Sequence, residues 1–188
     1  MHLVAQPPAD APARARVRHA RLFVAAVPPA AVLDQIAELT RPEIEGLRWT
    51  TRDQWHATLR FLGRVSDVDA VTAALEPVSL PRCEARLGPE TGRFGRRVLH
   101  VPVAGLDDLA AVIVAATAAV GEPPEDRPFA AHVTLARARA RRGTDLRALT
   151  GAPLAARWTV EEVCVIESHL HPRGARYELV QRVRTMEP

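Results

Sequence analysis

Apolar and polar positions alternate in two stretches of the chain that resemble each other. Within residues 55–62 and 131–138, the parts 55–61 and 131–135 place apolar side chains at every second position, with His, Thr or Arg between them. A period of two predicts half-buried β-strands. Residues 21–27 are almost continuously apolar and predict a buried strand. Shorter patterns predict further strands over residues 47–50, 83–87, 98–103, 158–167 and 177–184.

Helices are predicted between these strands, where apolar residues recur at helical spacing. The pair Pro28-Pro29 opens the first helix, because proline is tolerated in a first helical turn. Strands and helices do not alternate strictly, so the pattern predicts an α+β fold with largely antiparallel sheets. The predicted helices cover residues 28–39, 66–75 with Ser66 as N-cap, 106–120 and 144–149.

The two alternating stretches carry the same short motif. His56-Ala57-Thr58-Leu59 and His132-Val133-Thr134-Leu135 differ at one small apolar position. Their separation is too long for a short solenoid repeat. It suits two pseudo-symmetric lobes, each with an antiparallel sheet and covering helices, that face each other across a central cleft. Strand alternation places His56, Thr58 and Arg60 on one face, and it places His132 and Thr134 on the corresponding face.

This pair of motifs carries the groups that acid–base chemistry at phosphorus needs. The ordinary pKa of histidine is near 6.5, so one imidazole can act as a base while the other acts as an acid. The threonine hydroxyls can donate to charged oxygens in the transition state. Along one strand face a His and the next Thr lie roughly 6.5 to 7 Å apart, so both can reach one bound group. The four residues describe a metal-free site.

Composition narrows the function further. The chain has 188 residues, of which 47% are apolar, which suits one domain over residues 20–188. Residues 1–19 are rich in Pro, Ala and Arg and predict a disordered basic tail. No lysine occurs among the 25 basic residues. This absence excludes a ligase with a lysyl-nucleotide intermediate and a P-loop nucleotide site.

Cysteine content and hydropathy bear on the compartment. Cys83 and Cys164 are the only cysteines, too few for a disulfide framework or a zinc ribbon. No apolar run approaches the roughly 18 residues that span a membrane, and the N-terminus lacks a convincing signal peptide. We therefore expect a cytoplasmic protein without a membrane partner.

The chain resembles the two-histidine phosphoesterases in its two motif segments, Trp55 to Gly63 and Ala131 to Arg137. More narrowly, it resembles the bacterial and archaeal RNA 2′,3′-cyclic phosphodiesterases, also called 2′-5′ RNA ligases. The run Arg21-Leu22-Phe23-Val24-Ala25 looks like the first strand of that family, and residues 168–179 look like its closing segment. The family usually has proline directly before the second histidine, where this chain has Ala131. That change removes no reactive group.

The resemblance implies a bilobal α+β fold and hydrolysis of a terminal 2′,3′-cyclic phosphate to a 2′-phosphomonoester. By the family pattern His56 would donate a proton to the departing 3′ oxygen and His132 would accept one from water. Thr58 and Thr134 would hold the non-bridging oxygens. The reverse reaction would join RNA ends through a 2′-5′ bond without ATP. The motifs alone do not decide which histidine is the acid.

Other side chains are weaker candidates for substrate binding. Arg60 and Arg137 flank the motifs and could bind phosphate, although Arg137 would point away from His132 unless the strand bulges. Phe129 and Tyr177 could stack on a base. His169 and His171 form a His-x-His pattern, but we see no acidic or cysteine partner at suitable spacing, so we predict no metal site. We expect no cofactor and a monomer that binds RNA or a nucleotide with a 2′,3′-cyclic phosphate end.

Two other functions fit the same residues. The first is a phosphodiesterase of the same fold that acts on a small cyclic nucleotide or an ADP-ribose cyclic phosphate. The second is a basic RNA-binding module whose histidines no longer catalyse a reaction. The intact threonines of both motifs favour an enzyme.

Overall fold

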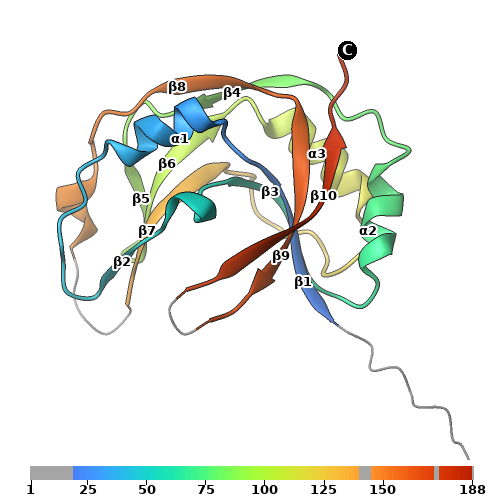
Figure 1. The fold of residues 1–188 in the computed structure, drawn as a ribbon, viewed down its shortest axis with the longest axis horizontal. Coiled ribbons are helices and arrows are strands. Elements are labelled where there is room, and N and C mark those ends of the chain that lie inside the picture. The colour runs from blue at the N-terminus through green and yellow to red at the C-terminus, as the bar shows by residue number, and fades with distance from the viewer. Residues whose placement is uncertain (1–18, 140–144, 172–173, 188) are drawn as a thin grey trace, which may run out of the picture.

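Ten strands form a single antiparallel sheet in the computed structural model, which describes residues 19–139, 145–171 and 174–187. The strand order is β10-β9-β1-β3-β7-β6-β4-β8, with β2 beside β7 and β5 beside β6. Figure 1 shows that this sheet curls strongly into an arch. The strands are β1 (Ala20–Ala26), β2 (Leu47–Trp49), β3 (Ala57–Val65), β4 (Cys83–Leu87), β5 (Gly92–Phe94), β6 (Val98–Ala104), β7 (His132–Ala138), β8 (Ala156–Val160), β9 (Glu162–His169) and β10 (Arg176–Arg184).

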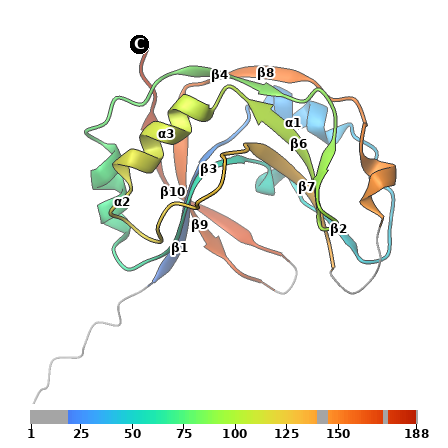
Figure 2. The same cartoon turned by 180° about the vertical axis from the view of Figure 1, so that it is seen from behind.

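Three α-helices and two 3-10 helices accompany the strands in the described part of the chain. Helix α3 packs across β3 and contacts α2, as the reverse view in Figure 2 shows. Leu109 and Ile113 of α3 and Val71 of α2 are fully buried in the main core. Helix α1 lies against β8 at the other end of the arch. The bounds are α1 (Ala30–Ala37), η1 (Arg52–Gln54), α2 (Val68–Leu75), α3 (Asp107–Ala116) and η2 (Leu146–Leu149).

The two motif strands, β3 and β7, are neighbours at the middle of the strand order. They run antiparallel and share one ladder position, Ala57 opposite Val133. Both residues are fully buried. Antiparallel pairing in this register places His56 across from Thr134 and Thr58 across from His132. The repeated motif is therefore arranged around a local pseudo-twofold axis.

Each motif strand contains a β-bulge directly after its threonine. In β3 the partners of Val24 and Ala25 are Arg60 and Thr58, so Leu59 is the extra residue. In β7 the partners of Leu99 and His100 are Ala136 and Thr134, so Leu135 is the extra residue. A bulge reverses the inward and outward alternation beyond it. The face of each strand that carries the histidine and the threonine is called the motif face. On this face the next side chain is therefore three positions after the threonine instead of two.

The expected α+β class with antiparallel strands is confirmed, and a division into two lobes around a cleft stays a prediction. The long strand expected over residues 158–167 is two strands, β8 and β9, which separate at Glu161. Strand β5 is not among the strands predicted from the sequence, and α3 ends at Ala116 instead of continuing to 120. Asp67 instead of Ser66 caps α2, since its carboxylate accepts from the backbone N–H of Ala70.

Some expectations concern residues outside the described ranges. The predicted tail over residues 1–19 falls almost entirely there, and so does part of the short helix expected over residues 144–149. Within the described part of the chain, none of the helices has the length and apolar character needed to cross a membrane.

Candidate active site

The four motif residues line one small polar pocket. His56 directly precedes β3 and Thr58 lies near its start, while His132 and Thr134 come from the start of β7. The cavity has a volume of about 100 Å³. Among the described residues that line it there are two arginines and no carboxylate, so the pocket suits an anion. The remaining lining residues are Arg48, Thr50, Gln54, Arg137, Ala175 and Tyr177.

The backbone two residues earlier acts on each imidazole. The Nδ1 of His132 lies 2.9 Å from the carbonyl oxygen of Ala130, and the backbone of Gln54 raises the pKa of His56 as a hydrogen-bond partner. In both cases the partner is two residues before the histidine. A neutral His132 that donates from Nδ1 carries its lone pair on Nε2. That tautomer leaves Nε2 as the acceptor of a proton.

Aromatic rings pack against both imidazoles. Phe23 stacks on His56 with ring centroids 4.7 Å apart, and Tyr177 approaches the same imidazole edge-on at 5.1 Å. Phe94 and His100 approach His132 edge-on at 4.8 and 5.4 Å. Packing on this scale restricts rotation of each ring about its χ2 angle.

The surroundings of both histidines favour the neutral imidazole. Burial lowers the pKa of His56 to about 4; the hydrogen bond to Gln54 opposes this, and the positive charges of His132 and Arg137 add to it. Burial also lowers the pKa of His132, against the hydrogen bond to Ala130 and together with the charges of Arg137 and Arg127. Because the two histidines influence each other, their titrations are coupled. A bound phosphate anion would favour the imidazolium form of both.

Arg137 lines the pocket because of the bulge in β7. Because Leu135 is the extra residue of the bulge, the side chain three positions after Thr134 lies on the motif face, with His132 and Thr134. Thr50 supports this bulge: its backbone N–H donates to the Leu135 carbonyl at 2.8 Å, and its hydroxyl lies 2.8 Å from the carbonyl oxygens of Thr134 and Leu135. Trp55 in turn donates its indole N–H to the Thr50 hydroxyl.

Arg60 lies on the other side of the sheet, so its expected place beside His56 and Thr58 is wrong. The bulge at Leu59 turns it away from the pocket, and its side chain is 4% exposed. Its guanidinium donates to the carbonyl oxygens of Phe61 and Glu122. Arg60 therefore ties β3 to the loop after α3. Phe129 is exposed and lies outside both pockets described here.

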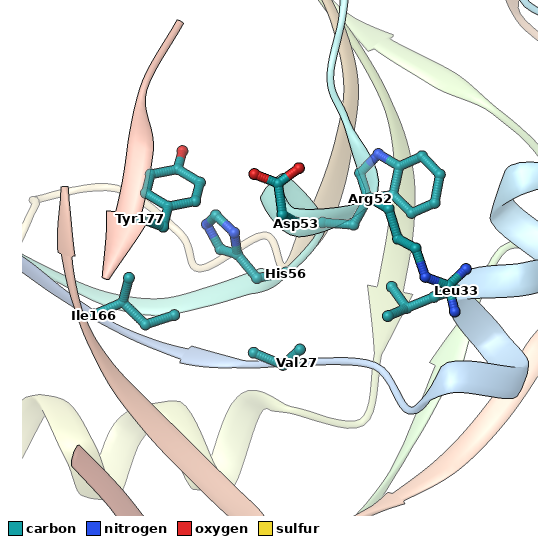
Figure 3. Close-up of a pocket in the computed structure, with 8 residues that line it drawn as sticks. Val27, Leu33, Arg52, Asp53, His56, Ile166 and Tyr177 are labelled. Carbon is teal, nitrogen blue, oxygen red and sulfur yellow. The ribbon is translucent and has the colours of Figure 1, made fainter. Parts of the chain in front are cut away.

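A second, larger cavity adjoins the polar pocket and shares His56 and Tyr177 with it. Its volume is about 440 Å³, and its walls are mostly apolar, with Arg52 and Asp53 at one side. Figure 3 shows Tyr177 and Ile166 on the side of β9 and β10, and Leu33 and Val27 on the opposite side of His56. A cavity of this size and polarity can accept a planar aromatic group.

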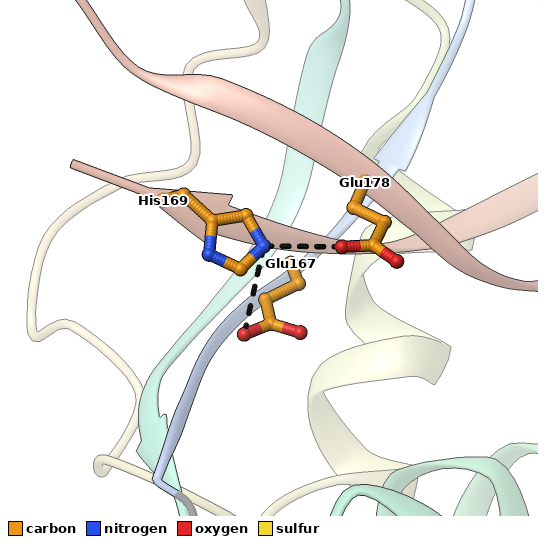
Figure 4. A group of neighbouring side chains, drawn as sticks. All are labelled: Glu167, His169 and Glu178. Atoms are coloured by element: carbon orange, nitrogen blue, oxygen red, sulfur yellow. Dashed lines mark hydrogen bonds and ion pairs between the residues drawn. The ribbon is translucent and has the colours of Figure 1, made fainter. Parts of the chain in front are cut away.

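His169 has two carboxylate partners, contrary to our expectation that it has none. On the β9–β10 pair its Nε2 lies 3.3 Å from Glu178 and 3.7 Å from Glu167. Figure 4 shows the three side chains and both contacts. Glu167 and Glu178 are directly opposite each other across the two strands. Glu167 lies two residues before His169, so alternation along β9 already places the two side chains on one face, whereas the Glu178 contact depends on strand register. His169 is paired with both carboxylates, and none of the three residues lines the pocket.

Several pocket residues were missed from the sequence. Arg48 and Gln54 come from the segment before the first motif, and Gln54 joins η1 to the residue before β10 by donating to the Ala175 carbonyl. The capping pattern Thr51 to Gln54 predicts a helical turn but says nothing about the pocket. His100, which lies beside the pocket, was not predicted as a site residue, because nothing along the chain shows that β6 pairs with β7.

The comparisons with known proteins agree with this arrangement. Residues 27–172 match the model of the 2′-5′ RNA ligase superfamily. The solved structure of TT0787 from Thermus thermophilus is similar with a TM-score of 0.73 and 26% identity, covering 89% of this chain and 98% of that one. A structure described as a phosphoesterase gives 0.74 and 25%, with 90% and 100% covered. No curated protein matches the chain.

Escherichia coli LigT is a further structural relative. Its apo form is similar with a TM-score of 0.69 and 26% identity, over 90% of this chain and 99% of that one. A complex of LigT with 3′-AMP gives a TM-score of 0.70 at 24% identity, over 90% and 100%.

The curled antiparallel sheet and the paired His-x-Thr motifs define an enzyme of the two-histidine phosphoesterase class. Since the family model spans most of the sequence, the chain belongs to the 2′-5′ RNA ligase superfamily.

Proposed function

We propose that this protein hydrolyses RNA terminal 2′,3′-cyclic phosphate to a 2′-phosphomonoester by two-histidine acid–base catalysis. One observation carries the proposal: His56, Thr58, His132 and Thr134 line a single pocket of about 100 Å³ together with Arg48 and Arg137. This volume matches a phosphoryl group, and the two arginines suit its charge. The complex of the similar protein LigT with 3′-AMP supports a nucleotide substrate.

In the proposed reaction His132 accepts a proton from water through Nε2, while the water oxygen attacks phosphorus. The bond from phosphorus to the 3′ oxygen breaks, and His56 donates a proton to that oxygen. The product carries its phosphate on the 2′ oxygen. Before the next turnover His132 releases its proton to solvent, and His56 takes up a proton from solvent. Thr58 and Thr134 donate to the non-bridging oxygens, where charge accumulates in the transition state.

These roles suit the surroundings of the two histidines. The Nδ1 of His132 is held by the Ala130 carbonyl, which leaves Nε2 free to accept a proton. The apolar cavity lies on the His56 side of the pocket. Since the departing 3′ oxygen belongs to the ribose of the terminal nucleotide, that nucleoside belongs on the same side, with its base in the 440 Å³ cavity beside Tyr177.

Ligation uses the same groups with a different nucleophile. A 5′-hydroxyl of a second RNA end takes the place of water, gives its proton to His132 and forms a 2′-5′ bond without ATP. The ring strain of the cyclic phosphate supplies the driving force, so no adenylated enzyme is needed.

The decisive assay identifies the product isomer. Incubation with an oligonucleotide that ends in a 2′,3′-cyclic phosphate should give the 2′-phosphomonoester. His56→Ala and His132→Ala should each lower kcat by roughly 10²- to 10⁴-fold. His169→Ala is the matched control, because this histidine lies outside the pocket, and it should keep full activity. A 3′-phosphomonoester product, or hydrolysis that survives both alanine variants, would overturn the proposal.

The alternative substrates are separated by comparing kcat/KM for a nucleoside 2′,3′-cyclic phosphate, an ADP-ribose cyclic phosphate and the oligonucleotide. A preference for the oligonucleotide supports an RNA end as substrate. If the unsubstituted protein binds RNA but hydrolyses none of the three compounds, it is a binding module.

A further inference from the structure

His100 lies beside the pocket on β6, the strand next to β7. It is opposite Thr134 in the ladder, and its side chain is only 7% exposed. On its other side β5 brings Gly92 opposite His100. A Cβ at position 92 would lie 3.3 Å from the Cε1 and Nε2 atoms of the imidazole. Because glycine lacks that atom, the ring of His100 fits against β5.

Three aromatic rings meet at this place. Phe94 and His100 are stacked almost parallel, with centroids 3.9 Å apart and planes inclined by 7°. Both meet the imidazole of His132 edge-on, with interplanar angles of 79° for Phe94 and 73° for His100. The stacked pair therefore forms a wall along one side of His132, while the Nδ1 bond to Ala130 fixes the tautomer.

We propose that His100, together with Phe94, is a positioning residue that holds the imidazole of His132 with Nε2 turned toward the substrate phosphorus. The proposal rests on the proposed function, in which His132 is the proton acceptor. A proton acceptor must keep its nitrogen within a few tenths of an ångström and a narrow angle of the attacking oxygen. The hydrogen bond alone permits rotation about its own axis, and the ring wall prevents it.

The charges around His132 agree with a neutral wall. Arg137 and Arg127 bring positive charge toward His132, and His56 faces it from the β3 side. Burial lowers the pKa of His100 to about 4, with the charge of His132 acting in the same direction. His100 is therefore neutral in the neutral pH range and adds no further positive charge beside the proton acceptor.

The chemistry of His100 also supplies a suitable variant. Among the described residues its buried Nδ1 has no hydrogen-bond partner. Leaving a buried polar atom unpaired is unfavourable. Phenylalanine keeps an aromatic ring at this place without that cost, so His100→Phe preserves the wall, whereas His100→Ala removes it and opens His132 to solvent.

The test compares these two variants with His169→Ala as a control, using a nucleoside 2′,3′-cyclic phosphate. We expect His100→Ala to lower kcat by roughly 10- to 100-fold with little change in KM. The limb of the pH profile that belongs to His132 should move toward the ordinary histidine range. His100→Phe should retain kcat within about 3-fold. Unchanged kcat and pH profile in His100→Ala, or equal losses in both variants, would overturn the positioning role.

NMR of the histidine side chains gives a readout that does not depend on turnover. In His100→Ala the signals of the His132 ring should broaden, and the pKa of His132 should rise, whereas His100→Phe should leave the signals sharp. If the parent protein lacks cyclic phosphodiesterase activity while these spectral changes occur, the proposed function fails and the positioning of His132 stands. Identical His132 signals in all three proteins sink the positioning role.

Discussion

Leu59 and Leu135 are the extra residues of two β-bulges, and each directly follows a motif threonine. The bulges decide which arginine reaches the pocket. Without them, alternation would place Arg60 on the motif face and Arg137 on the opposite one. With them, Arg60 is buried on the far side of the sheet, and Arg137 lines the pocket.

Arg137 and Arg60 should therefore respond differently to substitution. Arg137→Ala should lower kcat/KM by roughly 10-fold or more, because a charged contact to phosphate is lost, with little change in the free energy of unfolding. Arg60→Met should instead destabilise the fold by about 1 to 3 kcal/mol, since the carbonyls of Phe61 and Glu122 lose their donor. Steady-state kinetics and urea unfolding of both variants check this contrast. If Arg60→Met lowers activity and Arg137→Ala lowers stability instead, the assignment of Arg137 to the pocket is wrong.

The pH dependence of kcat/KM should lie on the acid side of ordinary histidine chemistry. The acid must be protonated and the base neutral, and burial lowers the pKa of both His56 and His132. We therefore expect a bell-shaped profile of kcat/KM against pH, with both limbs below about pH 6.5 for the free enzyme. The kcat profile should lie at higher pH, because bound phosphate favours both imidazolium forms. A kcat/KM profile that peaks in the alkaline range contradicts this electrostatic picture.

Stability should fall on acidification for the same reason. The folded-state pKa of His100 is about 4, below the ordinary value near 6.5. Between these values the unfolded chain binds a proton that the folded chain excludes, so stability is complete above pH 6.5 and decreases as the pH falls. His100 alone contributes on the order of 1 to 2 kcal/mol of this loss between about pH 6.5 and pH 5. His100→Phe should reduce the difference between urea unfolding curves recorded near pH 7 and pH 5. Equal differences in the two proteins would show that His100 does not titrate in this way.

Chelation should leave the activity intact. The described residues that line the pocket offer two arginines and no carboxylate, a set that repels divalent cations. Turnover of the cyclic phosphate should be the same in buffer and in excess EDTA. His169→Ala, which disrupts the cluster with Glu167 and Glu178, serves as the second comparison. Strong inhibition by EDTA that a divalent ion reverses counts against two-histidine catalysis.

The sequence predicted the motif strands and the four residues that the structure brings into one pocket. It did so because the period of two and the repeated His-x-Thr pattern are local properties. The faces of the side chains that follow the two threonines were misassigned, because a bulge depends on the partner strand. The bulge at Leu135 is supported by Thr50, which is far away along the chain. His100 and Arg48 escaped notice because only strand pairing brings them to the motif residues. Long-range pairing of this kind is not encoded in any single segment.

The position three residues after each threonine makes the two halves of the pocket chemically unequal. On the β7 side it holds the cation of Arg137, whereas on the β3 side it holds Phe61, which packs in a small apolar cluster with Phe23 and Tyr177. A quartet of two histidines and two threonines with twofold symmetry would accept a phosphodiester in either orientation. This difference polarises the site, so a bound nucleotide has one preferred direction and each imidazole keeps one task.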